Sequence, residues 1–298
     1  MKTTKILVLL LFIIVPVLLN AQGIDQMKLI KDLKYLSSDE LAGRAPLTKG
    51  NLKARAYIKD RFKELGLTSQ YDNYTQFFHF KAEKQIENAA NIISFIPGKS
   101  TEKIIVITAH YDHIGIKDGE IYNGADDNAS GTAALLALAE YFSQSPPEHS
   151  MIFAALDAEE MGLQGAKALV KDFPFPLDQV VLNINMDMIS RSDKNELYAS
   201  GTLHNPQLKH ILEEAAAGQS VKLMFGHDTP GTGHDDWTNA SDHAAFHAQK
   251  IPYVYFGVED HEDYHRPTDT FDKINQEFYF QSVNLILECT KELDQSID

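Results

Sequence analysis

Short apolar runs alternate with amphipathic stretches over most of the chain. Four runs with polar or glycine flanks predict buried strands at 103–109, 151–156, 180–186 and 251–257. Helical periodicity predicts two helices within 25–66 and further helices at 131–142, after 163 and at 275–293. Strands alternating with helices predict an α/β fold, with a mixed, centrally parallel sheet and helices on both faces.

Helix boundaries have signals of their own. Gly66 ends the second N-terminal helix, and Ser130 is the expected N-cap of helix 131–142, which stops before Pro146 and Pro147. We assign the final helix to the core because four apolar side chains recur on one face: Tyr279, Val283, Ile286 and Leu287.

The first 21 residues have the pattern of a secretory signal peptide. Lys2 and Lys5 precede an apolar run at 6–19, and Ala21 offers a small residue for cleavage before Gln22. The run is short for a membrane span, although an uncleaved anchor is the alternative. We therefore expect a secreted or periplasmic protein without stable membrane association after cleavage.

The charge and the cysteine content exclude some classes of binding partner and any intramolecular disulfide. The net charge is −15, and without residues 1–21 there are 25 basic and 42 acidic residues, a net charge of −17. Such a chain should repel nucleic acid and anionic membranes, whereas divalent cations would offset its charge. Cys289 is the only cysteine, so no intramolecular disulfide can form, and its apolar surroundings predict a buried thiol.

Acidic and imidazole side chains follow almost every predicted strand. In chain order they are His110, Asp112, Asp126, Asp127, Glu159, Glu160, Asp187 and His265. The carboxyl ends of parallel strands form one edge of a sheet, where ligands bind in such folds. These side chains are therefore expected to converge.

When charged carboxylates and imidazoles converge in a crevice, the free-energy cost of removing them from water has to be offset by a binding partner. Uncompensated, such a cluster would be severely penalised in a crevice of low dielectric. Bound metal supplies the compensation, and His, Asp and Glu without Cys favour zinc, with enough candidates for two ions sharing a carboxylate. Adjacent acids can then divide their roles, so that one of Glu159 and Glu160 binds metal and the other is a general base. Asp112 could fix the tautomer of His110.

The same residues lie in motifs that resemble the secreted zinc aminopeptidases of metallopeptidase family twenty-eight. LSSDELAGR at 36–44 is similar to its bacterial members. Segment 73–88 is too short for the protease-associated domain that many relatives insert, so the resemblance implies one catalytic domain at 22–298. The other motifs are HYD at 110–112, GADDNASG at 124–131, DAEEMGLQGA at 157–166, NMD at 185–187, SDHAAF at 241–246 and YHRPTDT at 264–270.

The resemblance also implies roles for individual residues. Glu159 would be the general base, Tyr264 a weaker candidate as donor to the developing oxyanion, and Asp127 would follow Asp126 through a cis peptide bond. Asp242 either orients the metal ligands without binding the metal itself or has a purely structural role. Two zinc ions per chain would be held by His110, Asp126 as the bridge, Glu160, Asp187 and His265.

Each motif alone has an ordinary explanation. An acidic pair before a helix usually interacts with the helix dipole, and single histidines usually pack in the core or lie on the surface. It is far less probable that all the candidate ligands converge by chance than that any single motif has its ordinary explanation. No role is assigned to the histidines at 79, 149, 204, 210, 227, 234 and 247, although 227 and 234 could line the substrate loop.

The leading hypothesis is therefore a zinc aminopeptidase that hydrolyses N-terminal residues from peptides with a free N-terminus. The alternative is a glutaminyl-peptide cyclotransferase, a similar fold that uses a single zinc. A carboxypeptidase or dipeptidase fits the motif order less well. A non-catalytic metal-binding module is disfavoured because Glu159 is present.

Overall fold

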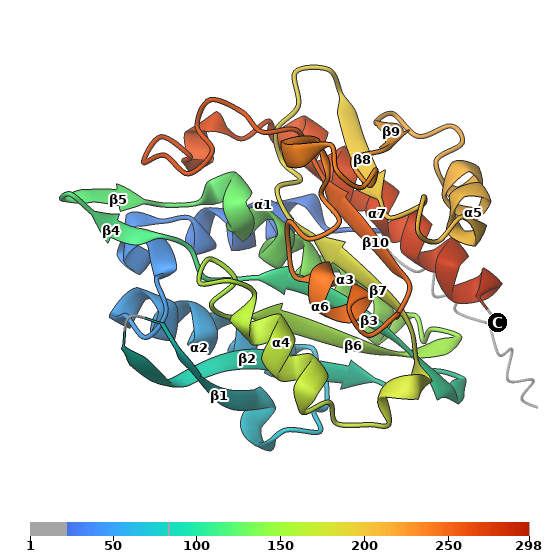
Figure 1. Cartoon of the computed structure of the whole chain (residues 1–298), viewed down its shortest axis with the longest axis horizontal. Helices are drawn as coiled ribbons and strands as arrows, with labels where there is room; N and C mark the ends of the chain where they lie inside the picture. Colours follow the sequence, from blue (N-terminus) through green and yellow to red (C-terminus); the bar gives the residue numbers. More distant parts are fainter. Residues whose placement is uncertain (1–22, 83, 298) are drawn as a thin grey trace, which may run out of the picture.

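The computed structural model describes residues 23–82 and 84–297 (Figure 1). The predicted signal peptide at 1–21 and its cleavage point before Gln22 lie outside the described residues.

An eight-stranded sheet forms the centre of the molecule, in the order β1-β2-β6-β3-β7-β10-β8-β9. The four central strands, β6, β3, β7 and β10, are parallel, whereas β1, β2 and β8 pair antiparallel with their inner neighbours and β9 runs parallel to β8. This confirms the predicted mixed, centrally parallel sheet. The bounds are β1 Thr75–Lys81, β2 Gln85–Ile96, β3 Ser100–His110, β6 His149–Leu156, β7 Val180–Met186, β8 Glu196–Ser200, β9 Lys222–Phe225 and β10 Tyr253–Gly257.

The four strands predicted from the sequence are the four central ones. They are buried on both faces and so read as continuous apolar runs. The outer strands were not predicted. Exposed and buried residues mix along β1 and β2, β8 has only five residues, and β9 has four, none of them buried. A separate hairpin, β4 Gly115–Lys117 with β5 Glu120–Tyr122, lies beyond β3.

Helices cover both faces of the sheet, as predicted (Figure 1). Successive side chains of β3 point to opposite faces. Ile105 and Ile107 belong to the larger core with α1, α2, α3, α5 and α7, whereas Ile104 and Val106 belong to a smaller core under α4 and α6. The bounds are α1 Gln26–Leu36, α2 Lys49–Glu64, α3 Gly131–Gln144, α4 Gln164–Lys171, α5 Gln207–Ala215, α6 His243–His247 and α7 Gln276–Ser296.

The start of α3 differs from the prediction. Ser130 is itself helical, with φ −63° and ψ −51°, and its side chain does not cap the helix. Its hydroxyl instead donates to the carbonyl of Asp126 at 2.6 Å, and Asn128 Oδ1 accepts the N–H of Gly131 at 2.8 Å. Ser130 is at the N-cap position, as predicted, but the segment 125–130 is already helical, so its side chain does not cap α3.

The C-terminal helix and its cysteine agree with the sequence analysis. The four apolar residues predicted to face the core from α7 are all buried, and so is the free thiol of Cys289. Within the described residues, none of the helices combines the length and apolar character that crossing a membrane requires.

Candidate metal centre

The predicted site residues come from loops that follow the central parallel strands. His110 is the last residue of β3, and Asp187 directly follows β7. Glu159 and Glu160 lie in the loop after β6, and His265 lies in the loop after β10. Because these strands are neighbours in the sheet, their carboxyl ends deliver these side chains to one edge.

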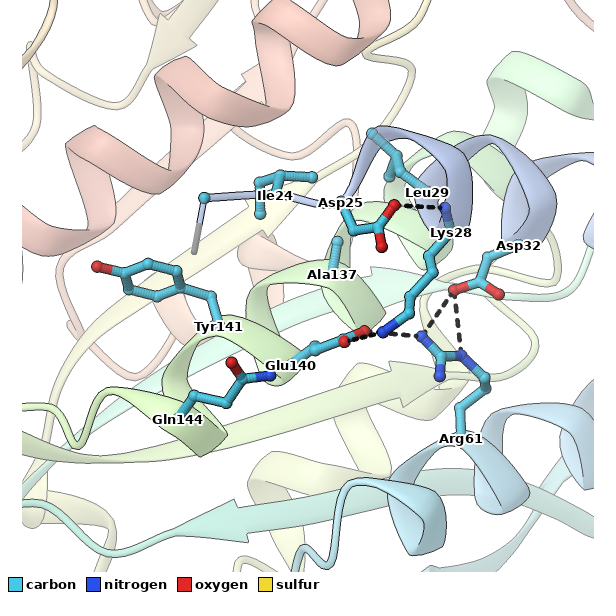
Figure 2. Close-up of a pocket in the computed structure, with 11 residues that line it drawn as sticks. Ile24, Asp25, Lys28, Leu29, Asp32, Arg61, Ala137, Glu140, Tyr141 and Gln144 are labelled. Carbon is cyan, nitrogen blue, oxygen red and sulfur yellow. Dashed lines mark hydrogen bonds and ion pairs between the residues drawn. The ribbon is translucent and has the colours of Figure 1, made fainter. Parts of the chain in front are cut away.

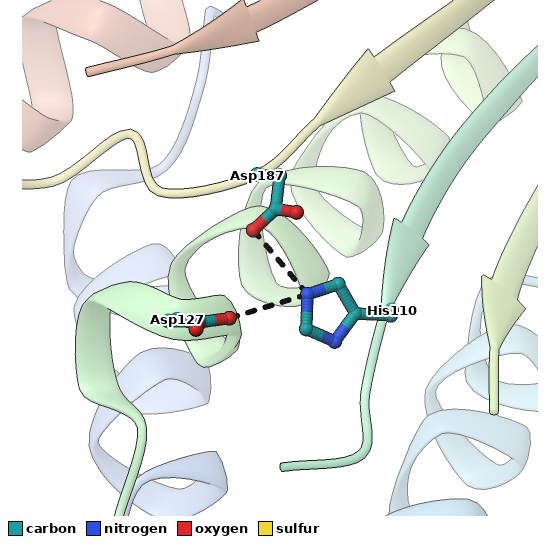
Figure 3. A group of neighbouring side chains, drawn as sticks. All are labelled: His110, Asp127 and Asp187. Atoms are coloured by element: carbon teal, nitrogen blue, oxygen red, sulfur yellow. Dashed lines mark hydrogen bonds and ion pairs between the residues drawn. The ribbon is translucent and has the colours of Figure 1, made fainter. Parts of the chain in front are cut away.

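The first cluster consists of His110, Asp127 and Asp187 (Figure 3). His110 Nε2 lies 3.2 Å from Asp127 Oδ1 and 3.3 Å from Asp187 Oδ1. All three residues are buried. Figure 3 shows both carboxylates facing the same imidazole nitrogen.

The second cluster uses the other oxygen of Asp127. Asp127 Oδ2 lies 3.0 Å from His265 Nε2, and Glu160 Oε2 lies 3.4 Å from the same nitrogen. Glu160 Oε1 is 2.7 Å from His113 Nδ1, so this cluster contains two imidazoles. The carboxylate of Asp127 is therefore shared between the two clusters.

Asp126 does not occupy the shared position, which corrects the sequence analysis. Its Oδ1 accepts hydrogen bonds from the main chain and hydroxyl of Ser190 at 2.8 and 2.6 Å, and its Oδ2 lies 3.0 Å from His261 Nε2. The two adjacent aspartates point to different partners, and the cis peptide bond follows Asp127, joining it to Asn128. The sequence analysis was wrong by one residue in both respects.

Asp269 holds the acidic turn, the segment Ala125–Ser130 that contains Asp126 and Asp127, in place. Its carboxylate accepts the N–H of Asp126 at 3.0 Å and the N–H of Asp127 at 3.1 Å. Burial raises the pKa of Asp269 to about 6, and the charge of Asp126 raises it as well. The turn therefore depends on a carboxylate from a loop more than a hundred residues away, within the motif YHRPTDT.

Two histidines near the site were not singled out in the sequence. His113 faces Glu160, and His261 faces Asp126. The sequence could have identified His113 as a site residue because it lies three residues after His110, in the loop that follows β3. His261 carried no such signal, since its long loop does not fix its direction.

Asp112 contacts both His110 and the loop of the predicted base. Its carboxylate accepts the N–H of Glu159 at 3.0 Å. His110 Nδ1 lies 3.1 Å from the main-chain oxygen of Asp112, whereas the carboxylate is 3.7 Å away. His110 Nδ1 therefore faces Asp112, as predicted, with the main-chain oxygen nearer to it than the carboxylate.

Glu159 is placed apart from the two clusters. Burial raises its pKa well above the ordinary value, the charge of His110 opposes the shift, and the charges of Asp242 and Asp187 add to it. A carboxylate whose pKa is raised holds a proton more readily, which suits a group that accepts and returns one.

Asp242 and Tyr264 complete the predicted set. Both oxygens of Asp242 are buried without a hydrogen-bond partner among the described residues, and burial raises its pKa to about 8. The ring of Tyr264 stacks on His265 with centroids 4.0 Å apart. Tyr264 therefore lies beside the second cluster.

The donor set fits zinc. It offers imidazole nitrogens and carboxylate oxygens, and Cys289 lies elsewhere in the core. His113 Nδ1 and Glu160 Oε1 are buried and, despite their separation of 2.7 Å, form no hydrogen bond in the described part of the chain. Buried polar atoms that converge without bonding each other indicate a missing common partner.

Comparison with known proteins places the chain in a family. The description "Peptidase family M28" matches residues 91–290, and the chain belongs to this family. Aminopeptidase YwaD of Bacillus subtilis is 29% identical over 217 residues, which cover 69% of this chain and 45% of that protein. The chain thus spans about half the length, or less, of the first curated relatives it matches.

Solved structures share the fold. An aminopeptidase from Aneurinibacillus sp. strain AM-1 superimposes with a TM-score of 0.71 at 17% identity, covering 91% of this chain and 94% of that one. A glutaminyl cyclase from Bacteroides thetaiotaomicron gives a TM-score of 0.72 at 19% identity, covering 90% and 98%. Both chemistries therefore occur on this architecture.

Proposed function

We propose that the protein is a zinc-dependent aminopeptidase that hydrolyses N-terminal residues from peptides. One observation carries the proposal: Asp127 presents one oxygen to each of two donor clusters. Glu159 lies outside the clusters but near enough for the charges of His110 and Asp187 to act on its carboxylate. Membership of peptidase family M28 agrees with it.

The ligand assignment follows the two clusters. His110, Asp127 and Asp187 would hold one zinc ion, and Asp127, Glu160 and His265 the second, with His113 as a further donor. Zinc bound there would polarise the scissile carbonyl and lower the pKa of water. The separation of donors into two groups around one carboxylate supports two ions per chain.

The protein's own groups would move the proton. The carboxylate of Glu159 would accept a proton from the attacking water and return it to the leaving amine. Its raised pKa makes it a stronger base than an ordinary glutamate. Tyr264, beside His265, would donate a hydrogen bond to the oxygen that becomes negative during attack.

The charge around the site suits a free N-terminus. Asp127, Glu160 and Asp187 lie in the two clusters, the charges of Asp187 and Asp112 act on the nearby Asp242, and the chain as a whole has a net charge of −15. An ammonium group would be attracted to this field, whereas an acetylated N-terminus would lose the attraction.

The test uses zinc-loaded protein and a mixture of peptides, each with a free and an acetylated N-terminus. We expect mass spectrometry to show stepwise shortening of the free set alone. If none of the peptides is shortened, the aminopeptidase proposal is wrong.

Glutaminyl cyclisation is the second candidate because the glutaminyl cyclase noted above shares this fold. A peptide beginning with glutamine distinguishes the two. Cyclisation would release ammonia from that peptide and leave the others intact, with one zinc ion per chain by elemental analysis. Shortening with two ions per chain would exclude it.

We also propose that the protein acts outside the cytoplasm. The support is the N-terminal pattern of Lys2, Lys5 and the apolar run at 6–19. Expression of the full chain in a secreting host should yield a mature protein whose N-terminal peptide starts at Gln22. An intact N-terminus on the exported protein would indicate an uncleaved anchor.

A further inference from the structure

Arg44 is a fully buried cation behind the metal centre. It closes the motif LSSDELAGR and is only 1% exposed. Among the described residues, its side chain donates hydrogen bonds to main-chain carbonyls alone. Nε donates to Tyr111 at 2.8 Å, Nη1 to Asn123 at 2.6 Å and also to Leu36, and Nη2 to Gly124 at 3.0 Å.

Three of those four carbonyls, those of Tyr111, Asn123 and Gly124, belong to the loops that carry proposed zinc ligands. Tyr111 lies directly after His110, whereas Asn123 and Gly124 lie just before the turn that contains Asp127. A single planar guanidinium therefore joins two of the three segments whose side chains form the first cluster, those of His110 and Asp127. The N–H donors of the guanidinium have a rigid, fork-like arrangement, which fixes the spacing between the two loops.

The main chain of Arg44 reaches a third loop of the site. Asn51 Nδ2 donates to the carbonyl of Arg44 at 3.2 Å and to Asp157 Oδ1 at 2.9 Å. Asp157 begins the loop that carries Glu159 and Glu160. The segment around Arg44 thus connects three loops of the site without contributing a ligand.

Close packing leaves this segment little freedom. Gly43 has a φ of +71°, and a Cβ at this position would lie 2.4 Å from the carbonyl oxygen of Tyr122 and 2.5 Å from that of Gly115. The main chain beside Arg44 therefore lies directly against the β4–β5 hairpin. Glycine allows both the left-handed conformation and the close approach.

The charge of Arg44 is not neutralised by a contacting carboxylate in the described part of the chain. Burial lowers its pKa to about 10, and the charges of Asp112, Asp127, Asp269 and Glu160 oppose the shift. The guanidinium is therefore positive at neutral pH. Its charge acts through space on the acidic groups of the site.

We propose that Arg44 is a positioning residue of the zinc site, which holds the His110 and Asp127 loops together and offsets the charge of the carboxylates. The inference rests on the proposed function, because it takes zinc as the metal. Without Arg44, four carbonyls lose their buried donor and the loops can separate. The cluster would then have to be assembled when zinc binds, which lowers the affinity.

The test compares the zinc affinities of wild type, Arg44→Met and Arg44→Lys by competition with a chromogenic chelator. We expect Arg44→Met to raise the zinc dissociation constant by about 10–100-fold, the range for groups that orient metal ligands. Arg44→Lys keeps the charge but not the fork, so we expect a smaller loss of at least about threefold.

Arg61→Met is the matched control. Arg61 is also largely buried, but it pairs with Asp32 and Glu140 in a network that includes Lys28, as Figure 2 shows. Because this network lies among α1, α2 and α3, its loss should reduce thermal stability while zinc affinity stays within about twofold of wild type. A purely structural arginine would behave in this way.

The outcomes separate this inference from the proposed function. If wild type fails to bind zinc, the proposed function fails. If wild type binds zinc and the folded Arg44 variants match Arg61→Met in affinity, the positioning role is wrong. Should Arg44→Met not fold, Arg44→Lys decides alone, and an affinity equal to wild type overturns the proposal.

Discussion

Two adjacent aspartates show how the centre is built at the scale of single residues. Asp127 faces the imidazoles of His110 and His265, whereas Asp126 bonds Ser190 and His261. Two neighbouring residues of the same type therefore have different roles. Variants at these two positions test the assignment directly.

Asp127→Asn should abolish high-affinity zinc binding, lowering affinity by more than ~100-fold, because the shared carboxylate loses its charge. Asp126→Asn should keep zinc affinity within about tenfold. It should instead lower the free energy of unfolding by about 1–3 kcal/mol, since the bonds to Ser190 and His261 weaken. Isothermal titration and urea denaturation measure the two effects. The reverse order of zinc affinities would contradict the assignment.

Glu159→Gln is the corresponding test of the proton carrier. We expect kcat to fall by about 10²–10⁴-fold, because the amide cannot accept a proton from water. Zinc content should be unchanged, since Glu159 lies outside both donor clusters. Glu213→Gln, at a half-exposed position on α5, is the control and should leave kcat at the wild-type value. Turnover by Glu159→Gln at the wild-type rate would exclude this mechanism.

At the scale of elements, α7 closes the larger core. Its buried face carries Tyr279 and Val283, and the hydroxyl of Tyr279 donates to the carbonyl of Ser130 at 2.7 Å. Ser130 precedes α3, so the final helix contacts the region that leads from the acidic turn into α3. The position of α7 is thus linked to the geometry of the metal centre.

The start of α7 is capped by Asn275, whose Oδ1 accepts the N–H of Phe278 at 3.1 Å. Asn275→Ala should lower the free energy of unfolding by ~1 kcal/mol, because the first turn loses this acceptor. Gln281→Ala, a partly exposed position within the same helix, should change it by less than about 0.5 kcal/mol. Urea denaturation checks both. An equal effect of the two variants would show that the cap contributes nothing.

At the scale of the whole molecule, zinc should stabilise the fold. The loops of the centre hold several buried carboxylates close together, and their repulsion is offset when a cation binds. Zinc at about 1,000 times its dissociation constant adds about 4 kcal/mol to the free energy of unfolding. For a chain of this size, chelation should lower the melting temperature by roughly 10 °C.

Differential scanning fluorimetry with and without a chelator measures this shift. Restored zinc should recover the original melting temperature, while added magnesium should not, because the nitrogen donors favour zinc. A melting temperature that is insensitive to chelation would mean that metal binding is not coupled to folding.

The sequence by itself determined the central architecture and which loops carry the site. The strands β3, β6, β7 and β10 are largely buried on both faces and mostly apolar, so their pattern identifies them without reference to other parts of the chain. Because parallel strands end at one edge, the convergence of His110, the Glu159–Glu160 loop and Asp187 also followed from their positions in the chain.

Only the tertiary structure decided the direction of each side chain. Which member of Asp126 and Asp127 faces the imidazoles depends on main-chain torsions in the turn, which the sequence pattern does not encode. The places of His261 and Arg44 depend on contacts with residues more than sixty positions away, Asp126 and Tyr111 respectively. Periodicity reports burial along one element, whereas such contacts are fixed by how elements pack against one another.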